Sequence, residues 1–315
     1  MLHTDRVDMD THRKLLIGKL LELLPDSGDY LPFEGVGFYR RHHCHDHKPV
    51  TYSPAIVVIA QGRKFMRMGN EEFVNGGNSY FIAGVDMPTS CSMAACSSGN
   101  PFLSITIDLD RTLIARLLSE MQQPCMPDDG YQGGAKVVDM DPEFLDAIVR
   151  LVDSAVNPGT NLLGRMIVQE IHYRLLTGPF GHRLRTLNTF GLPSNQVSQA
   201  ITWLKDNFHQ PFQVDELARR ANMATSTFHK HFKEVTTLSP LQYQKRLRLE
   251  EAQRLMLTEN LDASQASLNV GYDSLSQFTR EYKRLFGEPP RRDVAKIRKL
   301  AAHASDQNIW EQAAV

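Results

Sequence analysis

A tandem repeat in the last third of the chain is the feature that most restricts what this sequence can fold into. The segment 228–233, FHKHFK, returns at 278–283 as FTREYK, an offset of 50 residues. Pro240 and Pro290 keep the same offset. Self-similarity at a fixed period indicates one supersecondary unit that occurs twice.

Each copy is expected to contain a short helix, a tight turn and a second helix. The short helices are predicted at 214–221 and 263–269, where small or apolar residues recur on one face. The turns fall at Asn222 and Gly271, because both residue types tolerate the left-handed backbone conformation. This order of elements is typical of a helix-turn-helix unit.

The second helix of each copy has one aromatic face and one polar face. Phe228 and Phe232, like Phe278 and Tyr282, are four residues apart and are expected to anchor their helices inward. Polar and cationic side chains of the kind that reach base edges and phosphates in a major groove remain outside. The candidate DNA-binding residues are Thr225, Ser226, Thr227, His229, Lys230, Lys233, Ser274, Ser276, Gln277, Arg280 and Lys283.

Hydroxyl residues are suited to begin the second helices, namely Thr225 or Ser226 in the first copy and Ser274 in the second. Between the copies, residues 240–257 are predicted to form one long helix. Such a helix would hold the two units at a fixed separation. Recognition helices about 34 Å apart, one turn of DNA, would reach adjacent major grooves on one side of a duplex.

The charge distribution favours an anionic partner for the same region. Residues 195–300 carry 17 Lys and Arg against 12 Asp and Glu, a net of +5, although the whole chain has a net charge of −1. The remainder therefore carries −6. A basic segment on an otherwise acidic chain is typical of nucleic-acid binding, although moderately basic domains are also common elsewhere.

Residues 201–298 resemble the tandem helix-turn-helix domain of the AraC family of transcription regulators. The matching stretches are LARRANMATSTFHKHFK, SPLQYQKRLRLEEAQRL and VGYDSLSQFTREYKRLFGEPPRRD. The resemblance implies base contacts in each recognition helix, from Ser226, His229 and Lys230 in the first and from Ser276, Gln277 and Arg280 in the second. The chain departs from the family where large aliphatic residues are usual, with Ala263, Ala266 and Ser267. The second unit is therefore expected to pack more loosely.

The first half of the chain is expected to be mainly β-structure. Short apolar or alternating segments separated by Gly and Asn turns occur at 55–60, 64–68, 72–74, 79–83 and 103–109. Strands at this spacing predict a small sandwich or barrel. From Asp110 the apolar spacing becomes helical, with segments at 113–121, 144–156 and 162–176.

The stretches SPAIVVIAQGRKFMRMGNEEF, SYFIAGVDMPTS and PFLSITIDLD resemble the small cupin-like β-barrel of a subgroup of AraC-type regulators. The resemblance implies a domain that binds a small effector and helps the chain to form a homodimer. Residues 162–177 are the expected dimer surface, although their apolar residues would equally suit the core.

A histidine-rich segment, residues 42–47, raises the possibility of a metal site. In an extended chain His43, His45 and His47 would share one face, and imidazole is a good ligand for zinc, nickel or copper. We see no further histidine that would complete a cupin ligand set. A polar loop is the alternative to a metal-sensing site here.

The nature of the effector stays open at this point. The four cysteines, Cys44, Cys91, Cys96 and Cys125, are expected to be reduced thiols. Cys44, Cys91 or Cys96 could instead sense oxidants or electrophiles through a thiolate. An organic effector could occupy a pocket lined by apolar residues, namely Phe65, Met66, Phe81 and Phe102.

The sequence thus predicts a two-domain α+β protein. We expect an effector and dimerisation domain at 1–180, a linker at 181–195, a tandem helix-turn-helix domain at 196–300 and a tail at 301–315. The function expected is sequence-specific transcription regulation in the cytoplasm of a bacterium. The partners expected are double-stranded DNA, a small effector and, for an activator, RNA polymerase. We expect no enzyme activity, no cofactor and no membrane span, since no run of about 18 apolar residues occurs.

Two alternatives belong to other functional classes. One is a metal-dependent cupin enzyme with a DNA-binding appendage, which would need a complete set of metal ligands inside the barrel. The other is a DNA-repair protein that joins AraC-type helices to a reactive cysteine. The scarcity of clustered cysteines counts against the second alternative.

Overall fold

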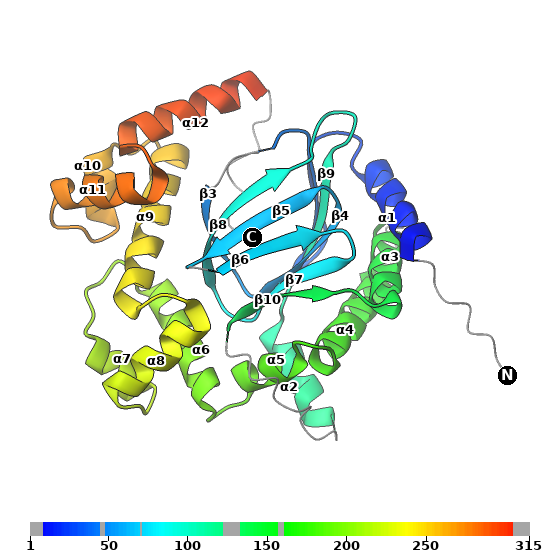
Figure 1. Ribbon diagram of the computed structural model, residues 1–315, viewed down its shortest axis with the longest axis horizontal. Helices are drawn as coiled ribbons and strands as arrows, with labels where there is room; N and C mark the ends of the chain where they lie inside the picture. Colours follow the sequence, from blue (N-terminus) through cyan, green and yellow to red (C-terminus); the bar gives the residue numbers. More distant parts are fainter. Residues whose placement is uncertain (1–8, 45–47, 70, 122–132, 157–160, 305–315) are drawn as a thin grey trace.

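The computed structural model describes residues 9–44, 48–69, 71–121, 133–156 and 161–304. Two antiparallel sheets make up most of the N-terminal half (Figure 1). In the larger sheet the strands follow the order β1 (Gly28–Phe33), β2 (Val36–Arg41), β9 (Phe102–Asp108), β4 (Ala55–Gln61), β7 (Ser79–Ala83) and β10 (Ala135–Asp139). In the smaller sheet the order is β3 (Lys48–Tyr52), β8 (Met87–Ala94), β5 (Arg63–Met68) and β6 (Glu71–Gly76).

The two sheets pack face to face and are not closed into one. Val57, Ile59 and Phe81 of the larger sheet share an apolar core with Met66 and Met68 of the smaller. Among the described strands, no hydrogen-bonded ladder joins the edge of one sheet to an edge of the other. The expected cupin-like barrel is therefore not confirmed, because the domain is a two-sheet sandwich.

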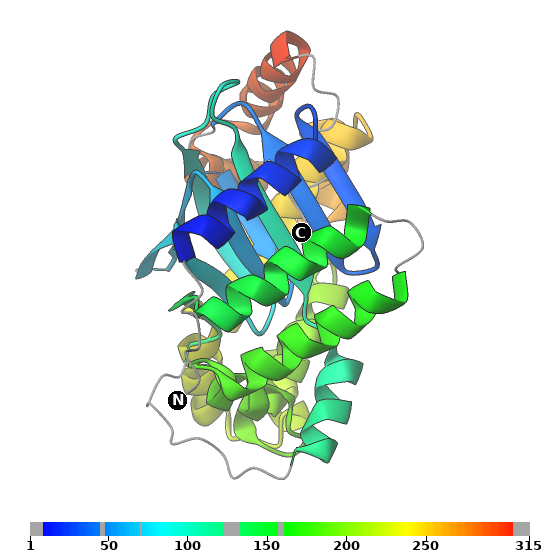
Figure 2. The ribbon, with the colours of Figure 1, turned by 90° about the vertical axis from the view of Figure 1, so that its right-hand side faces the viewer.

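Helices cover the other face of the larger sheet. They are α1 (Met9–Leu23), α3 (Pro142–Val156) and α4 (Asn161–Thr177), and Figure 2 shows them in front of that sheet. The ring of Tyr80 on β7 stacks on that of Phe144 on α3 at 4.6 Å between centroids. The helices α2 (Arg111–Glu120), α3 and α4 confirm the helical segments predicted after Asp110. The strand β10 within the same stretch and the helix α1 before the first strand were not predicted.

The C-terminal half is helical in the residues described. It contains α6 (Pro193–Asp206), α7 (Val214–Arg220), α8 (Thr225–Thr236), α9 (Pro240–Thr258), α10 (Ala263–Asn269), α11 (Leu275–Phe286) and α12 (Pro290–Ala304). Phe228, Phe232 and Tyr243 belong to the same apolar core as the smaller sheet. The helices from α9 onward enclose a core of their own around Phe278 and Tyr282.

The segment expected to be a linker contains a helix, α5 (Gly181–Asn188), in which Leu184 and Leu187 are buried. Figure 1 shows α5 between α4 and α6, so a structured connection leads from one half to the other. Of the helices described, none is both long enough and apolar enough to cross a membrane.

Candidate DNA interface

The first helix-turn-helix unit consists of α7 and α8. Asn222 stands in the turn with a φ of 49°, which confirms the left-handed residue predicted there. Phe228 and Phe232 are both fully buried, with ring centroids 5.6 Å apart, and Phe232 packs edge-on against Tyr243 of α9. The aromatic face of α8 therefore points into the protein, as the four-residue spacing predicted.

The second unit repeats this arrangement with α10 and α11. Gly271 occupies the turn with a φ of 85°, and a Cβ at this position would lie 2.1 Å from the carbonyl oxygen of His209. Both the backbone conformation and the close approach therefore require glycine. Phe278 and Tyr282 are fully buried, as predicted.

The helix caps agree with the prediction in one unit only. The hydroxyl of Ser274 accepts a hydrogen bond from the backbone N–H of Gln277 at 3.3 Å and caps α11. The prediction for α8 was wrong, because its N-cap is Ala224, which has no side chain that can accept a hydrogen bond. The hydroxyl of Thr225 instead donates to Asp215 of α7 at 2.7 Å and joins the two helices of the unit.

The polar faces of α8 and α11 are open to solvent. Thr225 and His229 are half-buried. The exposed candidates are Ser226, Thr227, Lys230, Lys233, Ser274, Ser276, Gln277, Arg280 and Lys283. Arg280 and the lysines at 233 and 283 have no hydrogen bond or ion pair within the part of the chain that the structure describes. Their charges are therefore available to an anionic partner.

Helix α9 holds the two units together and confirms the predicted long helix. Arg248 donates to the carbonyl oxygens of Phe208 at 2.7 Å and Gly271 at 2.7 Å, and weaker bonds reach His209 and Gln210. The guanidinium therefore binds the segment before the first unit and the turn of the second at once. Its N–H groups thereby supply hydrogen bonds to carbonyl oxygens that have no partner within a helix.

A second contact from α9 places α11. Glu281 accepts hydrogen bonds from Lys245 at 2.7 Å, from Tyr272 at 2.8 Å and from Gln277 at 3.2 Å. Burial alone would raise the pKa of Glu281, but these donors outweigh it and lower the pKa below its usual value. The charged carboxylate of Glu281 thus orients the side chain of Gln277, a candidate base contact.

The small residues of α10 are enclosed by the second core. Ala266 and Ser267 are buried, and the Ser267 hydroxyl donates to the carbonyl oxygen of Ser264 at 2.8 Å. Asp262 caps the helix in a capping box with Gln265. Because these side chains are small, α10 lies close to its neighbours. The capping box satisfies backbone N–H groups at the start of the helix and so stabilises this short helix.

Comparison with known proteins bears on both halves of the chain. Residues 32–183 match the family model described as AraC-type transcriptional regulator N-terminus, and residues 217–295 match a helix-turn-helix domain model. The chain belongs to the AraC family of transcriptional regulators.

The relatives of this AraC-family chain are distant. The transcriptional regulator ArgR of Pseudomonas aeruginosa is 26% identical over 47% of this chain and 45% of its own length. The activator RhaS of Klebsiella pneumoniae is 27% identical over 30% of this chain and 34% of its own length, so these matches span less than half of either relative. The uncharacterised regulator YobQ of Bacillus subtilis is 26% identical over 85% of this chain and 95% of its own length.

Solved structures show the same fold for most of the chain. ToxT from Vibrio cholerae with an unsaturated fatty acid bound matches with a TM-score of 0.51 at 11% identity, over 86% of this chain and 97% of ToxT. At this identity the match establishes the two-domain arrangement alone.

Contacts between the two domains were not predicted from the sequence. Asp86, which is buried in the turn between β7 and β8, pairs with Lys205 of α6 at 2.5 Å, and its carbonyl oxygen accepts from the Tyr243 hydroxyl at 3.0 Å. The carbonyl oxygen of Val235, near the end of α8, accepts from the N–H of Gly134 at 2.9 Å. The first recognition helix is thereby bonded directly to the segment that leads into β10.

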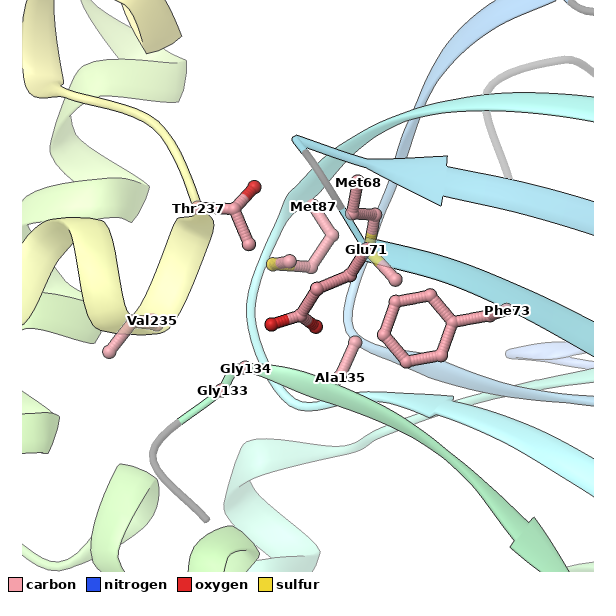
Figure 3. Close-up of a pocket in the computed structure, with 9 residues that line it drawn as sticks. All are labelled: Met68, Glu71, Phe73, Met87, Gly133, Gly134, Ala135, Val235 and Thr237. Carbon is pink, nitrogen blue, oxygen red and sulfur yellow. The ribbon is translucent and has the colours of Figure 1, made fainter.

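A small cavity lies at this contact (Figure 3). Glu71 and Phe73 of β6 face it from one side, and Val235 and Thr237 face it from the other. Its volume of about 10 Å³ is at the lower limit for a single water molecule. The cavity is therefore too small to hold an organic effector in this conformation.

The metal-site hypothesis receives no support from the described residues. His43 is exposed, whereas His45 and His47 lie outside the described residues. Within the described ranges no three His, Cys, Asp or Glu side chains are grouped closely enough to hold a metal ion. His42 accepts a hydrogen bond from Arg40 at 3.0 Å.

The expectation that all four cysteines are reduced was wrong for one pair. Cys44 and Cys96 form a disulfide with their Cα atoms 5.6 Å apart, a separation within the usual range. The turn after β2 and the turn after β8 lie at the same end of the sandwich, and this long-range contact cannot be read from sequence spacing. Cys91 is free and buried, and Cys125 lies outside the described residues.

Proposed function

We propose that this AraC-family chain is a sequence-specific DNA-binding transcriptional regulator that responds to a small effector sensed by its N-terminal domain. The observation that carries the proposal is the exposure of Lys230, Lys233, Arg280 and Lys283 on two helices whose opposite faces are buried by aromatic side chains. Four cations in repeated positions on two such helices suit the phosphates along a duplex.

The candidate residues divide into two roles. Arg280 and Gln277 are suited to base edges in the major groove, since Arg pairs with guanine and Gln with adenine. Lys233 and Lys283 stand near the ends of their helices and are suited to phosphates, which position the protein without reading sequence. The α9 helix spans 19 residues, about 28 Å at 1.5 Å per residue, which is comparable with one turn of DNA.

The N-terminal domain is the proposed sensor. The matched family model covers it, and ToxT, which shares the fold, has been solved with an unsaturated fatty acid bound. Its two facing sheets are compatible with a cupin-like ancestry, which stays a proposal. The bonds from Asp86 to α6 and α9, and the bond from Gly134 to α8, supply a route by which an effector in the sandwich would influence α8.

We propose a homodimer formed through α4. The helix exposes large apolar side chains along one stripe, with exposed fractions of 69% for Leu162, 60% for Met166 and 43% for Tyr173. Exposed apolar residues at helical spacing favour a helix–helix contact. As a DNA-binding regulator the chain would act in the cytoplasm, and an activator would also contact RNA polymerase.

Genome-wide mapping of DNA bound by the tagged chain tests this function. We expect a few enriched fragments upstream of coding regions, and we expect the enrichment to be lost in a variant with both Lys230→Ala and Arg280→Ala. A matched control is Arg67→Ala, which removes an exposed cation from β5 of the other domain. Enrichment that survives the double substitution, or none in the wild type, would refute the proposed DNA interface.

A further inference from the structure

The disulfide between Cys44 and Cys96 lies at the surface of the sandwich. Cys44 is exposed and Cys96 is half-buried. Glutathione and thioredoxin keep most thiols reduced in the compartment where a regulator meets chromosomal DNA, and disulfides there are usually transient. Exposed disulfides are also reduced more readily than buried structural ones. The position of this bond therefore favours a pair that opens and closes over a pair that only stabilises the fold.

Both cysteines are held in place by contacts that do not depend on the disulfide. Arg41 of β2 pairs in register with Phe102 of β9, so the segment after β2 and the turn before β9 begin side by side. The turn that contains Cys96 is closed by two backbone hydrogen bonds between Ser97 and Asn100, at 2.9 and 3.2 Å. The two thiols therefore stay within reach of each other after reduction, and the bond can form again without movement of the backbone.

The two sulfur atoms differ in their surroundings. The backbone N–H of Cys96 donates to Sγ of Cys44 at 3.1 Å. A donor at this position stabilises negative charge on Cys44 once the disulfide has opened, and the thiolate is the form of cysteine that reacts. Because Cys44 is also the more exposed residue, it is reached directly from solvent by a small oxidant. Cys44 is therefore suited to react first and Cys96 to complete the disulfide.

We propose that Cys44 and Cys96 form a reversible redox site, which hydroperoxides close and glutathione opens, as an input to the N-terminal domain beside its small effector. The effect of this site on DNA binding rests on the proposed regulator function. The oxidation and reduction of the pair do not.

The oxidation proceeds in two steps. The Cys44 thiolate attacks one oxygen of the hydroperoxide and breaks the O–O bond, which leaves a sulfenic acid on Cys44 and an alkoxide that takes up a proton. The Cys96 thiolate then attacks the sulfenic sulfur and displaces hydroxide, which takes up a proton to give water. Two thiols and one hydroperoxide thus yield one disulfide, one alcohol and one water. In the reverse direction two glutathione thiols become glutathione disulfide, and both cysteines return to thiols.

The disulfide ties β3 to β8 at one end of their ladder. Cys44 stands four residues before the start of β3, and Cys96 stands two residues after the end of β8. Strand β3 is at the edge of the smaller sheet and, among the described strands, pairs with β8 alone. It also contains Pro49, which cannot donate to the ladder. Opening of the disulfide therefore removes a restraint from a weakly held strand.

Strands β3 and β8 form the surface on which α9 lies (Figure 1). The hydroxyl of Thr51 on β3 donates to Glu250 of α9 at 2.5 Å, and the carbonyl oxygen of Thr89 on β8 accepts from Arg246 of the same helix. Because α9 joins the two recognition units, a looser β3 leaves their position less ordered. A less ordered chain loses more entropy when it binds both grooves, so the reduced chain should bind DNA more weakly.

Thiol mapping of the full wild-type chain tests the redox site. The oxidised chain is incubated with reduced glutathione at millimolar concentration, and free thiols are alkylated and located by mass spectrometry. We expect glutathione to open the bond between Cys44 and Cys96. After glutathione is removed, an equimolar amount of hydrogen peroxide should close the bond again. A bond that resists glutathione and opens only in dithiothreitol would be structural and would overturn the proposal.

Single variants test which sulfur reacts first. In Cys96→Ser the oxidation should stop at the sulfenic acid of Cys44, which dimedone labels. Labelling of Cys96 in Cys44→Ser should be at least ten-fold slower, because Cys96 is half-buried. Cys91→Ser removes a buried thiol and is the matched control, in which the disulfide should form at the wild-type rate. Equal labelling rates in the first two variants would contradict the role of Cys44.

Fluorescence anisotropy with a mapped genomic fragment tests the effect on DNA. We expect the Kd of the wild type to rise at least three-fold on reduction, and the Kd of Cys44→Ser to equal that of the reduced wild type in both conditions. Thr51→Val, which keeps the disulfide but removes the hydrogen bond to α9, should show a smaller difference. Equal wild-type Kd values in the two states would overturn the link to DNA. A chain that cycles between the states but binds no DNA would refute the regulator function and leave the redox site intact.

Discussion

Arg248 donates to the carbonyl oxygen of Gly271 at 2.7 Å, and this hydrogen bond ties the turn of the second helix-turn-helix unit to the helix that leaves the first. The same guanidinium bonds the backbone of 208–210 and lies 5.9 Å from the ring centroid of Tyr272. The spacing of the two recognition helices therefore depends on a side chain that lies outside both of their polar faces.

Replacement of Arg248 by Met should loosen that spacing. We expect a loss of about 2 kcal/mol in the free energy of unfolding, since hydrogen bonds to a charged group contribute about 1.5–3 kcal/mol. Affinity should fall more for DNA with both half-sites than for DNA with one, as measured by fluorescence anisotropy. The control is Arg254→Met on the same helix, whose bonds run to Glu251 and Glu259 at the surface. An equal loss of affinity for DNA with one half-site and for DNA with both would argue against a role of Arg248 in the spacing of the two helices.

Removal of the Arg280 side chain should weaken specific DNA binding. The guanidinium is exposed and has no internal partner among the described residues, so its loss should leave the fold intact. We expect Arg280→Ala to reduce affinity for a mapped operator by about 1–3 kcal/mol and to relax preference at one base pair. Gel-shift titrations at two salt concentrations would measure this, because phosphate contacts make binding fall steeply with salt. Unchanged affinity would remove Arg280 from the interface.

The buried His172 should make stability depend on pH. Its Nε2 accepts from the N–H of Asp110 at 3.1 Å, and its Nδ1 lies 2.8 Å from the carbonyl oxygen of Val168, which together require a neutral ring. Burial is the main cause of its lowered pKa. Below about pH 6.5 the unfolded chain therefore binds a proton that the folded chain does not. The contribution of neutral His172 to the free energy of unfolding is therefore present above that pH. It is lost as the pH falls through the pKa of His172 in the folded chain.

Urea unfolding at pH 7.5 and 5.5 would measure this contribution. The decrease in unfolding free energy from pH 7.5 to pH 5.5 should be smaller in His172→Gln than in the wild type. In His43→Gln, where the side chain is exposed, the decrease should equal that of the wild type. If His172→Gln keeps the full decrease, another group is responsible.

Loss of the disulfide between Cys44 and Cys96 should destabilise the sandwich. The bond closes a loop of 52 residues, for which the chain-entropy relation gives an upper bound of about 4 kcal/mol. We expect a lower Tm in Cys44→Ser under non-reducing conditions and the same Tm for both proteins in excess dithiothreitol. Cys91→Ser is the control, and peptide mapping without reduction would identify the linked pair. A wild-type Tm that does not respond to reductant would contradict this contribution.

Local patterns account for what could be predicted of the DNA interface. The aromatic spacing of Phe228 and Phe232 and the turn residues Asn222 and Gly271 act within a few residues, and each was predicted correctly. The first helix cap was not, because the Thr225 hydroxyl has a better acceptor in Asp215, ten residues away along the chain. A cap preference is a weak local signal when a neighbouring helix offers a carboxylate.

The sandwich was less predictable than the helices. Strands β4 to β7 and β9 follow apolar or alternating segments, and those segments were identified. The segments of β1, β3 and β8 contain Pro32, Pro49 and Pro88, residues that usually argue against a strand. The pairing of Cys44 with Cys96 depends on loops brought together by the fold, which sequence spacing does not reveal.

Hydroxyl-radical footprinting on a mapped genomic fragment tests the central claim most directly. The account predicts two protected patches on one side of the duplex, with centres about one helical turn apart. Lys230→Ala should weaken one patch and Arg280→Ala the other. A single patch, or two patches that both persist in the double variant, would contradict the conclusion that α8 and α11 read adjacent grooves.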